Sequence, residues 1–290
     1  MYKKFYGLTR NPFEVSPDPF FLYSTPRHSE ALCNLAYGVL RRKGFVVVTG
    51  EVGTGKTLLV RCLMEVLDKN KVASAFVYNP MISGLEFVSH VTKDLGLLPP
   101  PACTKGELLS QLNNYLMERS RQDLTTALVV DEAQLLSNEL LEEIRLLTNL
   151  ETTQHKLLQI VLVGQPEFEQ KLDSHQLRQL KQRVGLRCSL KPLEPTELKG
   201  YIHRRLELAG ANSRAANIFP DDTLPLIQFF SGGIPRLVNT LCENSLLAGF
   251  SQKRHQITSE IVHEVATDLH LDTFSYGAVP ERTFLSEREI

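Results

Sequence analysis

The sequence predicts an α/β fold in which a five-stranded parallel sheet is followed by a small all-helical domain. From residue 44 to residue 190, short apolar, β-branched runs alternate with helical stretches. This alternation is typical of a parallel sheet covered by helices on both faces. After Pro192 no strand candidate remains, and the apolar spacing is helical. We therefore expect an α/β domain at 1–192, a helical lid domain at 193–270 and a flexible tail at 271–290.

The predicted elements follow the chain in order. Strands are expected at 44–49, 72–78, 126–131, 157–163 and 187–190. Helices of the first domain are expected within 1–43 and at 56–68, 83–95, 105–120, 137–150 and 166–172. Helices of the second domain are expected at 195–209, 221–231, 234–251 and 258–269. The helix near 105 has a start signal of its own, because Thr104 and Glu107 have the spacing of a capping box.

Composition limits the class of protein. The 290 residues are 42% hydrophobic and 22% charged, and the net charge of −1 gives no overall attraction to nucleic acid or anionic lipid. The five cysteines are scattered and never form a C-x-x-C pair, which favours buried thiols in a reducing compartment. No apolar run reaches the roughly 18 residues of a spanning helix. We expect a soluble, cytoplasmic chain.

The segment 50–57 fits the phosphate-binding pattern G-x-x-x-x-G-K-[ST] at every fixed position, between a predicted strand and a predicted helix. Glycines let successive backbone N–H groups face a phosphate, and the helix N-terminus adds positive potential. Lys56 would reach the β- and γ-phosphates of ATP, and the Thr57 hydroxyl would ligate Mg²⁺. The predicted nucleotide-binding residues of this loop are Gly50, Glu51, Val52, Gly53, Thr54, Gly55, Lys56, Thr57 and Leu58.

Two carboxylates end the predicted strand at 126–131. Asp131 lies at the strand's carboxyl end, where it can hold Mg²⁺ and so belongs to the nucleotide site. Glu132 points elsewhere and can polarise the water that attacks the γ-phosphate. The alternative is that the pair simply begins a surface loop.

With these motifs in view, the chain resembles the AAA+ ATPases and, within them, the ExeA-like (general secretion pathway protein A) group. The resemblance covers about residues 1–270 and implies an AAA+ core, a helical lid, ATP and Mg²⁺ as cofactors, and hydrolysis of ATP. It is carried by Phe5-Tyr6-Gly7-Leu8, Asn11-Pro12-Phe13, Pro17-Asp18-Pro19, the loop at 50–57, Asp131-Glu132-Ala133-Gln134, Gly164-Gln165-Pro166-Glu167, Gln182-Arg183 and Gly232-Gly233-Ile234-Pro235-Arg236.

The resemblance implies roles for polar residues at two other strand ends. Asn79 follows the second predicted strand, where AAA+ proteins often place a polar residue that contacts the catalytic glutamate. An equally good interpretation is a turn residue before Pro80. Gln165 follows the fourth predicted strand in the sensor-1 position, where its amide would orient the attacking water. The longer Gln departs from the usual Asn, Thr or Ser, and the alternative is a turn residue.

Three arginines are candidates for contacts with the γ-phosphate. Arg183 fits the position of the arginine finger, which one subunit inserts into the site of its neighbour, and Arg187 is the rival. The alternative for both is a solvated basic face. Arg236 fits the sensor-2 position of the lid, with a surface arginine as its alternative. A finger implies a nucleotide-dependent homo-oligomer, either a ring or a filament.

The adenine pocket is expected in the segment before the phosphate loop. Its candidate residues are equally well explained as core packing, and they are Pro12, Phe13, Phe20, Phe21, Tyr23 and His28.

Two functions with different partners remain. In the first, the chain drives or switches assembly of a bacterial envelope system (secretion, pilus or exopolysaccharide export), with an inner-membrane or envelope-assembly protein as partner. It would then be cytoplasmic and peripheral at the inner membrane through that partner. In the alternative, the chain is a DNA-binding regulator that resembles transposition ATPases, which the neutral charge disfavours. Its DNA contacts would come from Lys199, Arg204, Arg205, Arg214, Lys253 and Arg254. A third possibility, a nucleotide-gated scaffold, is disfavoured by the intact Glu132.

Overall fold

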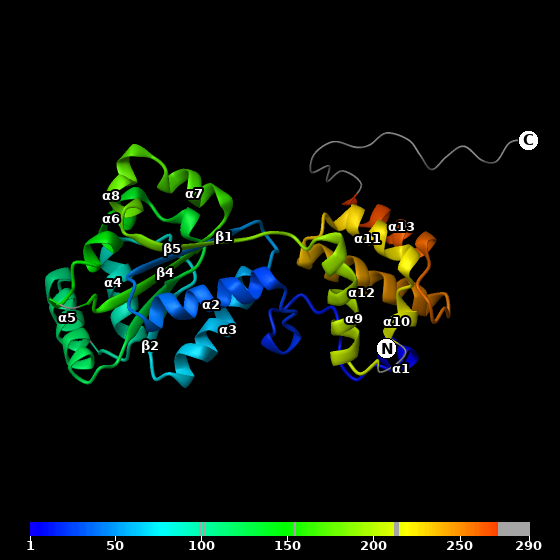
Figure 1. Cartoon of the computed structure of the whole chain (residues 1–290), viewed down its shortest axis with the longest axis horizontal. Coiled ribbons are helices and arrows are strands. Elements are labelled where there is room, and N and C mark those ends of the chain that lie inside the picture. The colour runs from blue at the N-terminus through cyan, green and yellow to red at the C-terminus, as the bar shows by residue number, and fades with distance from the viewer. Residues whose placement is uncertain (99, 101–102, 154, 212–214, 272–290) are drawn as a thin grey trace, which may run out of the picture. The chain divides into compact units, whose positions relative to one another are not determined.

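The computed structural model describes residues 1–98, 100, 103–153, 155–211 and 215–271 of the chain (Figure 1). The chain forms two compact units. The α/β unit is Pro17–Lys191, and the helical unit combines Met1–Ser16 with Pro192–Ile290. The tail predicted at 271–290 lies outside the described residues except for Leu271, which is buried.

A five-stranded parallel sheet forms the centre of the α/β unit, in the order β2-β3-β4-β1-β5. The prediction of five parallel strands is confirmed. The fifth strand begins at residue 184 rather than 187, because Val184 pairs with Phe45 beyond an irregularity in the register. The strands are β1 (Phe45–Gly50), β2 (Ala73–Val77), β3 (Thr126–Val130), β4 (Leu158–Gly164) and β5 (Val184–Leu190).

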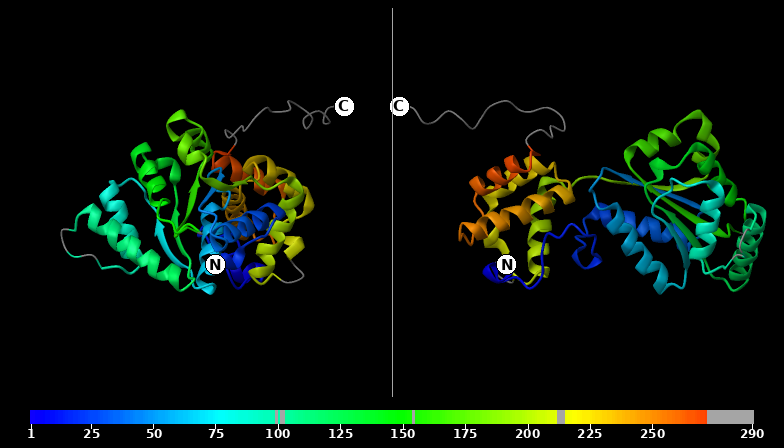
Figure 2. Two further views of the ribbon diagram at one scale, coloured as in Figure 1. Left: turned by 60° about the vertical axis from the view of Figure 1, so that its left-hand side comes forward. Right: turned by 180° about the vertical axis from the view of Figure 1, so that it is seen from behind.

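Helices cover both faces of this sheet, as Figure 2 shows. Side chains alternate along a strand, so Val46 and Val48 enter one core while Phe45 and Val47 enter the other. The first core is closed by α2 (Pro26–Leu40) and α3 (Lys56–Lys69). The second core is closed by α4 (Gly84–Asp94), α5 (Lys105–Arg121), α6 (Asn138–Leu147), α7 (Pro166–Leu172) and α8 (Arg178–Lys181).

The capping box predicted before α5 is present. Thr104 Oγ1 accepts the backbone N–H of Glu107 at 3.3 Å, and Glu107 Oε2 accepts the backbone N–H of Thr104 at 2.7 Å. Two otherwise unpaired donors at the start of α5 are thereby satisfied.

The helical unit has no strand among its described residues, as predicted. Its core is made by apolar residues of several helices, among them Ile202, Ile227, Val238 and Val262. The helices are α1 (Tyr2–Tyr6), α9 (Pro195–Leu208), α10 (Ala215–Ile218), α11 (Leu224–Ser231), α12 (Pro235–Ser251) and α13 (Ser259–Asp268).

Residues 1–16 differ from the prediction, which placed them in the α/β domain. They pack on the helical unit instead. Tyr2 Oη donates to both carboxylate oxygens of Glu243, at 2.7 and 2.8 Å. The buried Arg205 donates from Nε to the carbonyl of Pro12 at 2.6 Å. These partners lie about 200 residues away in sequence, so no local pattern could indicate them.

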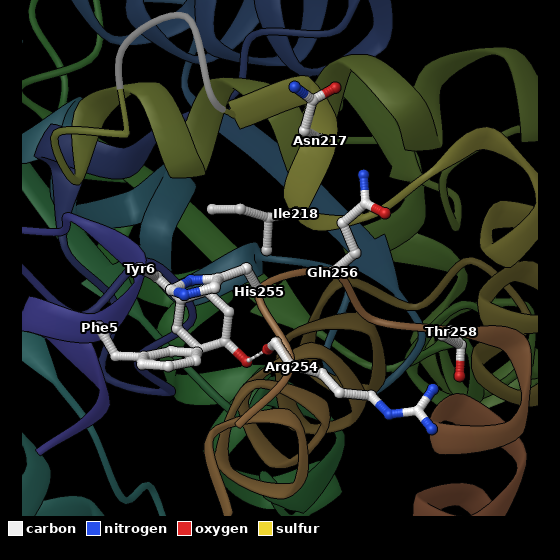
Figure 3. A pocket seen from close by; sticks show the side chains of 8 residues that line it. All are labelled: Phe5, Tyr6, Asn217, Ile218, Arg254, His255, Gln256 and Thr258. Carbon is white, nitrogen blue, oxygen red and sulfur yellow. Dashed lines mark hydrogen bonds between the residues drawn. The ribbon is translucent and has the colours of Figure 1, made fainter. Parts of the chain in front are cut away.

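A cavity of about 690 Å³ lies between α1 and the loop that follows α12 (Figure 3). Phe5 stacks on the His255 ring with centroids 4.0 Å apart and planes 7° from parallel. Tyr6 Oη donates to the carbonyl of Arg254 at 3.0 Å. The loop therefore holds the N-terminal helix through one stacked pair and one hydrogen bond.

Within the described part of the chain, no helix combines the length and the apolar character needed to cross a bilayer.

Candidate nucleotide-binding site

The loop at 50–57 connects the end of β1 to the start of α3, as predicted. Gly53 and Gly55 have φ angles of +85° and +99°, which side chains other than glycine rarely adopt. A Cβ added at Gly50 would lie 2.8 Å from the carbonyl oxygen of Leu190. The path of the loop backbone therefore requires glycine at these positions. The first amides of α3 have no partner within the helix and are available to an anion.

Lys56 lies folded over its own loop. Its Nζ donates to the carbonyls of Gly50 at 2.6 Å and Glu51 at 3.0 Å, and its side chain is buried. His28 lies behind the loop, with Nε2 3.3 Å from the carbonyl oxygen of Thr54. The ammonium group is thus placed beside the loop, where it neighbours any phosphate that the loop binds.

Thr57 and Asp131 meet beside the phosphate loop. Thr57 Oγ1 donates to Asp131 Oδ2 at 3.4 Å, and the Asp131 side chain is buried. Burial raises the pKa of Asp131, and the charge of Glu132 adds to this; the N–H of Glu132, Lys56 and Thr57 act in the opposite direction. A buried carboxylate next to a hydroxyl offers the oxygen ligands that Mg²⁺ prefers. The residues present therefore fit the predicted magnesium site.

Glu132 adopts a left-handed backbone conformation with φ of +51°, an uncommon one for a residue with a side chain. Its Oε2 accepts a hydrogen bond from Gln134 Nε2 at 2.5 Å and from Gln165 Nε2 at 3.4 Å. Backbone strain of this kind concentrates at functional sites.

Gln165 lies at the end of β4, the strand between β3 and β1. This position brings it next to Glu132, as the sensor-1 prediction requires. Its role towards water stays a prediction. Gln134, the last residue of the Asp-Glu-Ala-Gln motif, is a site residue that the sequence did not indicate, because its contacts with Glu132 and Gln165 depend on the fold.

Asn79 has an exposed side chain whose Oδ1 accepts the backbone N–H of Met81 at 3.2 Å. This is a turn at the end of β2, the alternative interpretation of this residue. No hydrogen bond joins Asn79 to Glu132 in the described structure.

Arg183 is held at the carboxyl end of α6. Its Nη1 donates to the carbonyl of Arg145 at 3.1 Å, to Asn149 Oδ1 at 2.8 Å and to Thr148 Oγ1. A guanidinium at this place satisfies the last carbonyls of a helix. The rival Arg187 is exposed on β5.

The remaining predicted residues divide between the two units. Arg236 is exposed in the first turn of α12, in the helical unit. Of the adenine-pocket candidates, Pro12 and Phe13 also belong to the helical unit, where Phe13 is fully buried edge-on to Phe219 with centroids 5.9 Å apart. Phe13 is therefore core packing of that unit. The candidates in the α/β unit are Phe20, Phe21, Tyr23 and His28.

The basic residues proposed for DNA contacts are mostly engaged within the helical unit. Arg205 is buried, Lys199 pairs with Asp221 at 2.7 Å, and Arg204 lies 3.6 Å from Glu207. Lys253 and Arg254 have exposed side chains. The remaining candidate, Arg214, lies outside the described residues.

Comparison with known sequences matches this region to a described family. The sequence model of the AAA domain family matches residues 40–172. General secretion pathway protein A of Aeromonas hydrophila is 40% identical over 257 residues, which cover 89% of this chain. The chain spans 46% of the length of that relative.

Solved structures with the same fold include three that cover about nine-tenths of this chain. Cdc6p of Pyrobaculum aerophilum aligns over 90% of this chain and 71% of its own, with a TM-score of 0.71 and 21% identity. ORC1 of Aeropyrum pernix, solved in complex with DNA, aligns over 90% of this chain and 69% of its own, with a TM-score of 0.62 and 19% identity. The RuvB branch migration motor of Thermotoga maritima aligns over 90% of this chain and 74% of its own, with a TM-score of 0.56 and 20% identity. At these identities the likeness shows the fold alone.

Proposed function

Because this chain belongs to the ExeA-like group of AAA+ proteins, we propose that it binds and hydrolyses Mg-ATP as a homo-oligomer and so drives or switches assembly of a bacterial envelope system. One observation carries the proposal: Thr57 and Asp131 meet beside the phosphate loop, and Glu132 follows directly with its carboxylate held by two amides. This juxtaposition supports a role for Thr57 and Asp131 as metal ligands and for Glu132 as a base.

The phosphate loop supplies the binding contacts. Backbone amides of the loop would face the phosphates, and Lys56 would exchange its contacts with Gly50 and Glu51 for phosphate oxygens. Thr57 and Asp131 would hold Mg²⁺, which would neutralise phosphate charge there. Asp131 has to be ionised for this, so metal-dependent binding weakens as the pH falls towards its raised pKa.

Glu132 acts as the base that polarises water, and Gln165 orients that water. The sensor-2 role of Arg236, which lies in the helical unit, stays a prediction. For the arginine finger, we favour Arg187 over Arg183, because the guanidinium of Arg183 already donates three hydrogen bonds within its own subunit. An exposed arginine is free to reach a neighbouring subunit.

Hydrolysis is tested with the purified chain of residues 1–290, Mg²⁺ and ATP, by following phosphate release. We expect Glu132→Gln to bind nucleotide with unchanged affinity and to lose about 100-fold or more in turnover. Gln122→Glu, on the surface of the same unit, is the control. Equal turnover by Glu132→Gln and the wild type would refute Glu132 as the base, and no turnover by the wild type would refute the ATPase proposal.

The envelope role draws on the relative's name, which assigns that protein to a secretion pathway. We propose a cytoplasmic protein that reaches the inner membrane through a partner. The alternative DNA role is weakened because Arg205 is buried and two other basic side chains are paired with acids.

The two roles are separated by the ATPase rate with inner-membrane vesicles or with duplex DNA, each at low and raised salt. Stimulation by vesicles and indifference to DNA is the expected result. Strong stimulation by DNA that falls steeply with salt would favour the alternative.

A further inference from the structure

The amide of Gln134 makes two hydrogen bonds that join the ends of β3 and β4. Its Nε2 donates to Glu132 Oε2 at 2.5 Å, and its Oε1 accepts the backbone N–H of Gln165 at 3.0 Å. A single side chain therefore connects the proposed base to the residue proposed to orient its water.

The local backbone is shaped for this contact. Glu132, with φ of +51°, precedes a short 3₁₀ turn at Ala133–Leu135, which returns the Gln134 side chain towards Glu132. A Cβ at Gly164 would lie 3.1 Å from Gln134 Oε1, closer than most such contacts, so glycine there leaves room for the amide. Ala133 is buried beneath the turn.

The contacts occupy one oxygen of the Glu132 carboxylate. Oε2 accepts both amide donors, from Gln134 and Gln165, whereas Oε1 has no hydrogen bond among the described residues. A carboxylate fixed through one oxygen keeps its plane, and its other oxygen keeps one direction. Rotation of Glu132 would otherwise have to be restricted by the substrate alone, at an entropic cost.

We propose that Gln134 is a positioning residue, which fixes the Glu132 carboxylate through Oε2 and leaves Oε1 to accept the proton of the attacking water. The inference rests on the proposed ATPase function. It assigns to Gln134 the contact with the glutamate that the sequence had suggested for Asn79, whose side chain is used in a turn.

Two substitutions at Gln134 separate its hydrogen bonds from its bulk. Gln134→Leu keeps a similar volume and removes both bonds. Gln134→His keeps one N–H donor and one nitrogen acceptor when the ring is neutral. The control is Gln122→Leu. Gln122, at the exposed carboxyl end of α5, also donates from Nε2 to a carboxylate oxygen, that of Glu118 at 2.9 Å.

The experiment measures kcat by phosphate release, and Kd with a fluorescent ATP analogue, for the four proteins. Misplacement of a reacting group by about 1 Å can cost about 100-fold in rate, so we expect kcat of Gln134→Leu to fall about 10- to 100-fold. We expect Kd to change by less than about twofold, because the residue does not touch the phosphate loop. Gln134→His should recover part of the loss, and Gln122→Leu should match the wild type. Melting temperatures of all four show whether each is folded.

The outcomes distinguish failure of the Gln134 positioning role from failure of the proposed ATPase function. A wild type that hydrolyses ATP, with a folded Gln134→Leu of equal kcat, overturns the positioning role alone. A folded Gln134→Leu that loses affinity in proportion to rate does the same, because that assigns Gln134 to nucleotide binding. A wild type without turnover overturns the proposed function and the positioning role together.

Discussion

Among single residues, Asp131 has a buried carboxylate whose loss of hydration is only partly offset by the backbone N–H of Glu132, by Lys56 and by Thr57. Burial raises its pKa, so the folded state disfavours the ionised form in the absence of a cation. A carboxylate whose folded pKa lies above its unfolded value favours folding when protonated, and that contribution is lost as the pH rises through the folded pKa. At neutral pH, Asp131 therefore lowers the stability of the nucleotide-free protein.

Asp131→Asn should raise the melting temperature of the nucleotide-free protein at pH 7, because the amide removes the buried charge. The gain should be smaller at pH 4 than at pH 7, because protonation of the aspartate increases as the pH falls towards its raised pKa. The same variant should lose the Mg²⁺-dependent part of ATP binding. Melting curves at both pH values, with and without Mg-ATP, check both expectations; a lower melting temperature at pH 7 would contradict them.

The two candidate finger arginines, Arg183 and Arg187, should differ in their contribution to the free energy of unfolding. Arg183→Ala removes three hydrogen bonds at the end of α6, and we expect the free energy of unfolding to fall by about 1–2 kcal/mol. Arg187→Ala removes an exposed side chain and should cost less than about 0.5 kcal/mol. Urea unfolding of the two variants decides this, and equal losses would remove the reason for preferring Arg187 as the finger.

Among the elements, α1 was the least accessible to sequence reasoning. It has only five residues, and its contacts are with α12 and the loop that follows it. Strands β1 and β4 were predictable because a short, continuous run of apolar β-branched residues is typical of a strand buried in a parallel sheet. The start of β5 was missed because Val184 and Gly185 do not continue an apolar run.

The candidate site shows the same division. The phosphate loop and the acidic pair were predictable because their chemistry fixes residue types at short spacing. Gln134 was not, since its role depends on the left-handed turn at Glu132 and on the room left by Gly164. The hydrogen bond from Arg183 to the end of α6 joins residues 38 positions apart in sequence, so no local pattern indicates it.

Tyr6 couples α1 to the rest of the helical unit in a way that depends on pH. Burial raises the pKa of Tyr6 to about 12 from its usual 10. The stabilisation is present below pH 10 and is lost as the pH rises from 10 to 12, because the unfolded state releases the proton first.

Tyr6→Phe should lower the free energy of unfolding by about 1 kcal/mol at pH 7, through loss of the bond to the Arg254 carbonyl. The variant should also lose less stability than the wild type between pH 10 and pH 12. Chemical unfolding at these three pH values provides the measurement. Parallel alkaline losses in both proteins would show that Tyr6 does not titrate in this range.

For the whole molecule, an arginine finger from a neighbour makes each active site a product of two subunits. Glu132→Gln lacks the base but keeps its arginine, and Arg187→Ala lacks the finger but keeps its base. Each alone should be inactive. An equal mixture should regain up to about a quarter of wild-type turnover, the chance that a competent site meets a competent neighbour in a head-to-tail assembly.

This complementation is measured as phosphate release after the two variants have been mixed and allowed to exchange subunits. The control mixture pairs Glu132→Gln with Lys56→Ala, neither of which has a competent site of its own. A wild-type turnover per subunit that stays constant on dilution, together with no recovery in the mixture, would count against a shared site.

Nucleotide binding by the phosphate loop is tested most directly by calorimetric titration of Mg-ATP into the wild type and into Lys56→Ala. We predict one saturable site per chain in the wild type, a weaker signal without Mg²⁺, and loss of binding in a Lys56→Ala protein that still unfolds cooperatively. A wild type that takes up no nucleotide, or a folded Lys56→Ala protein that binds it equally well, would refute the phosphate loop as a nucleotide-binding site.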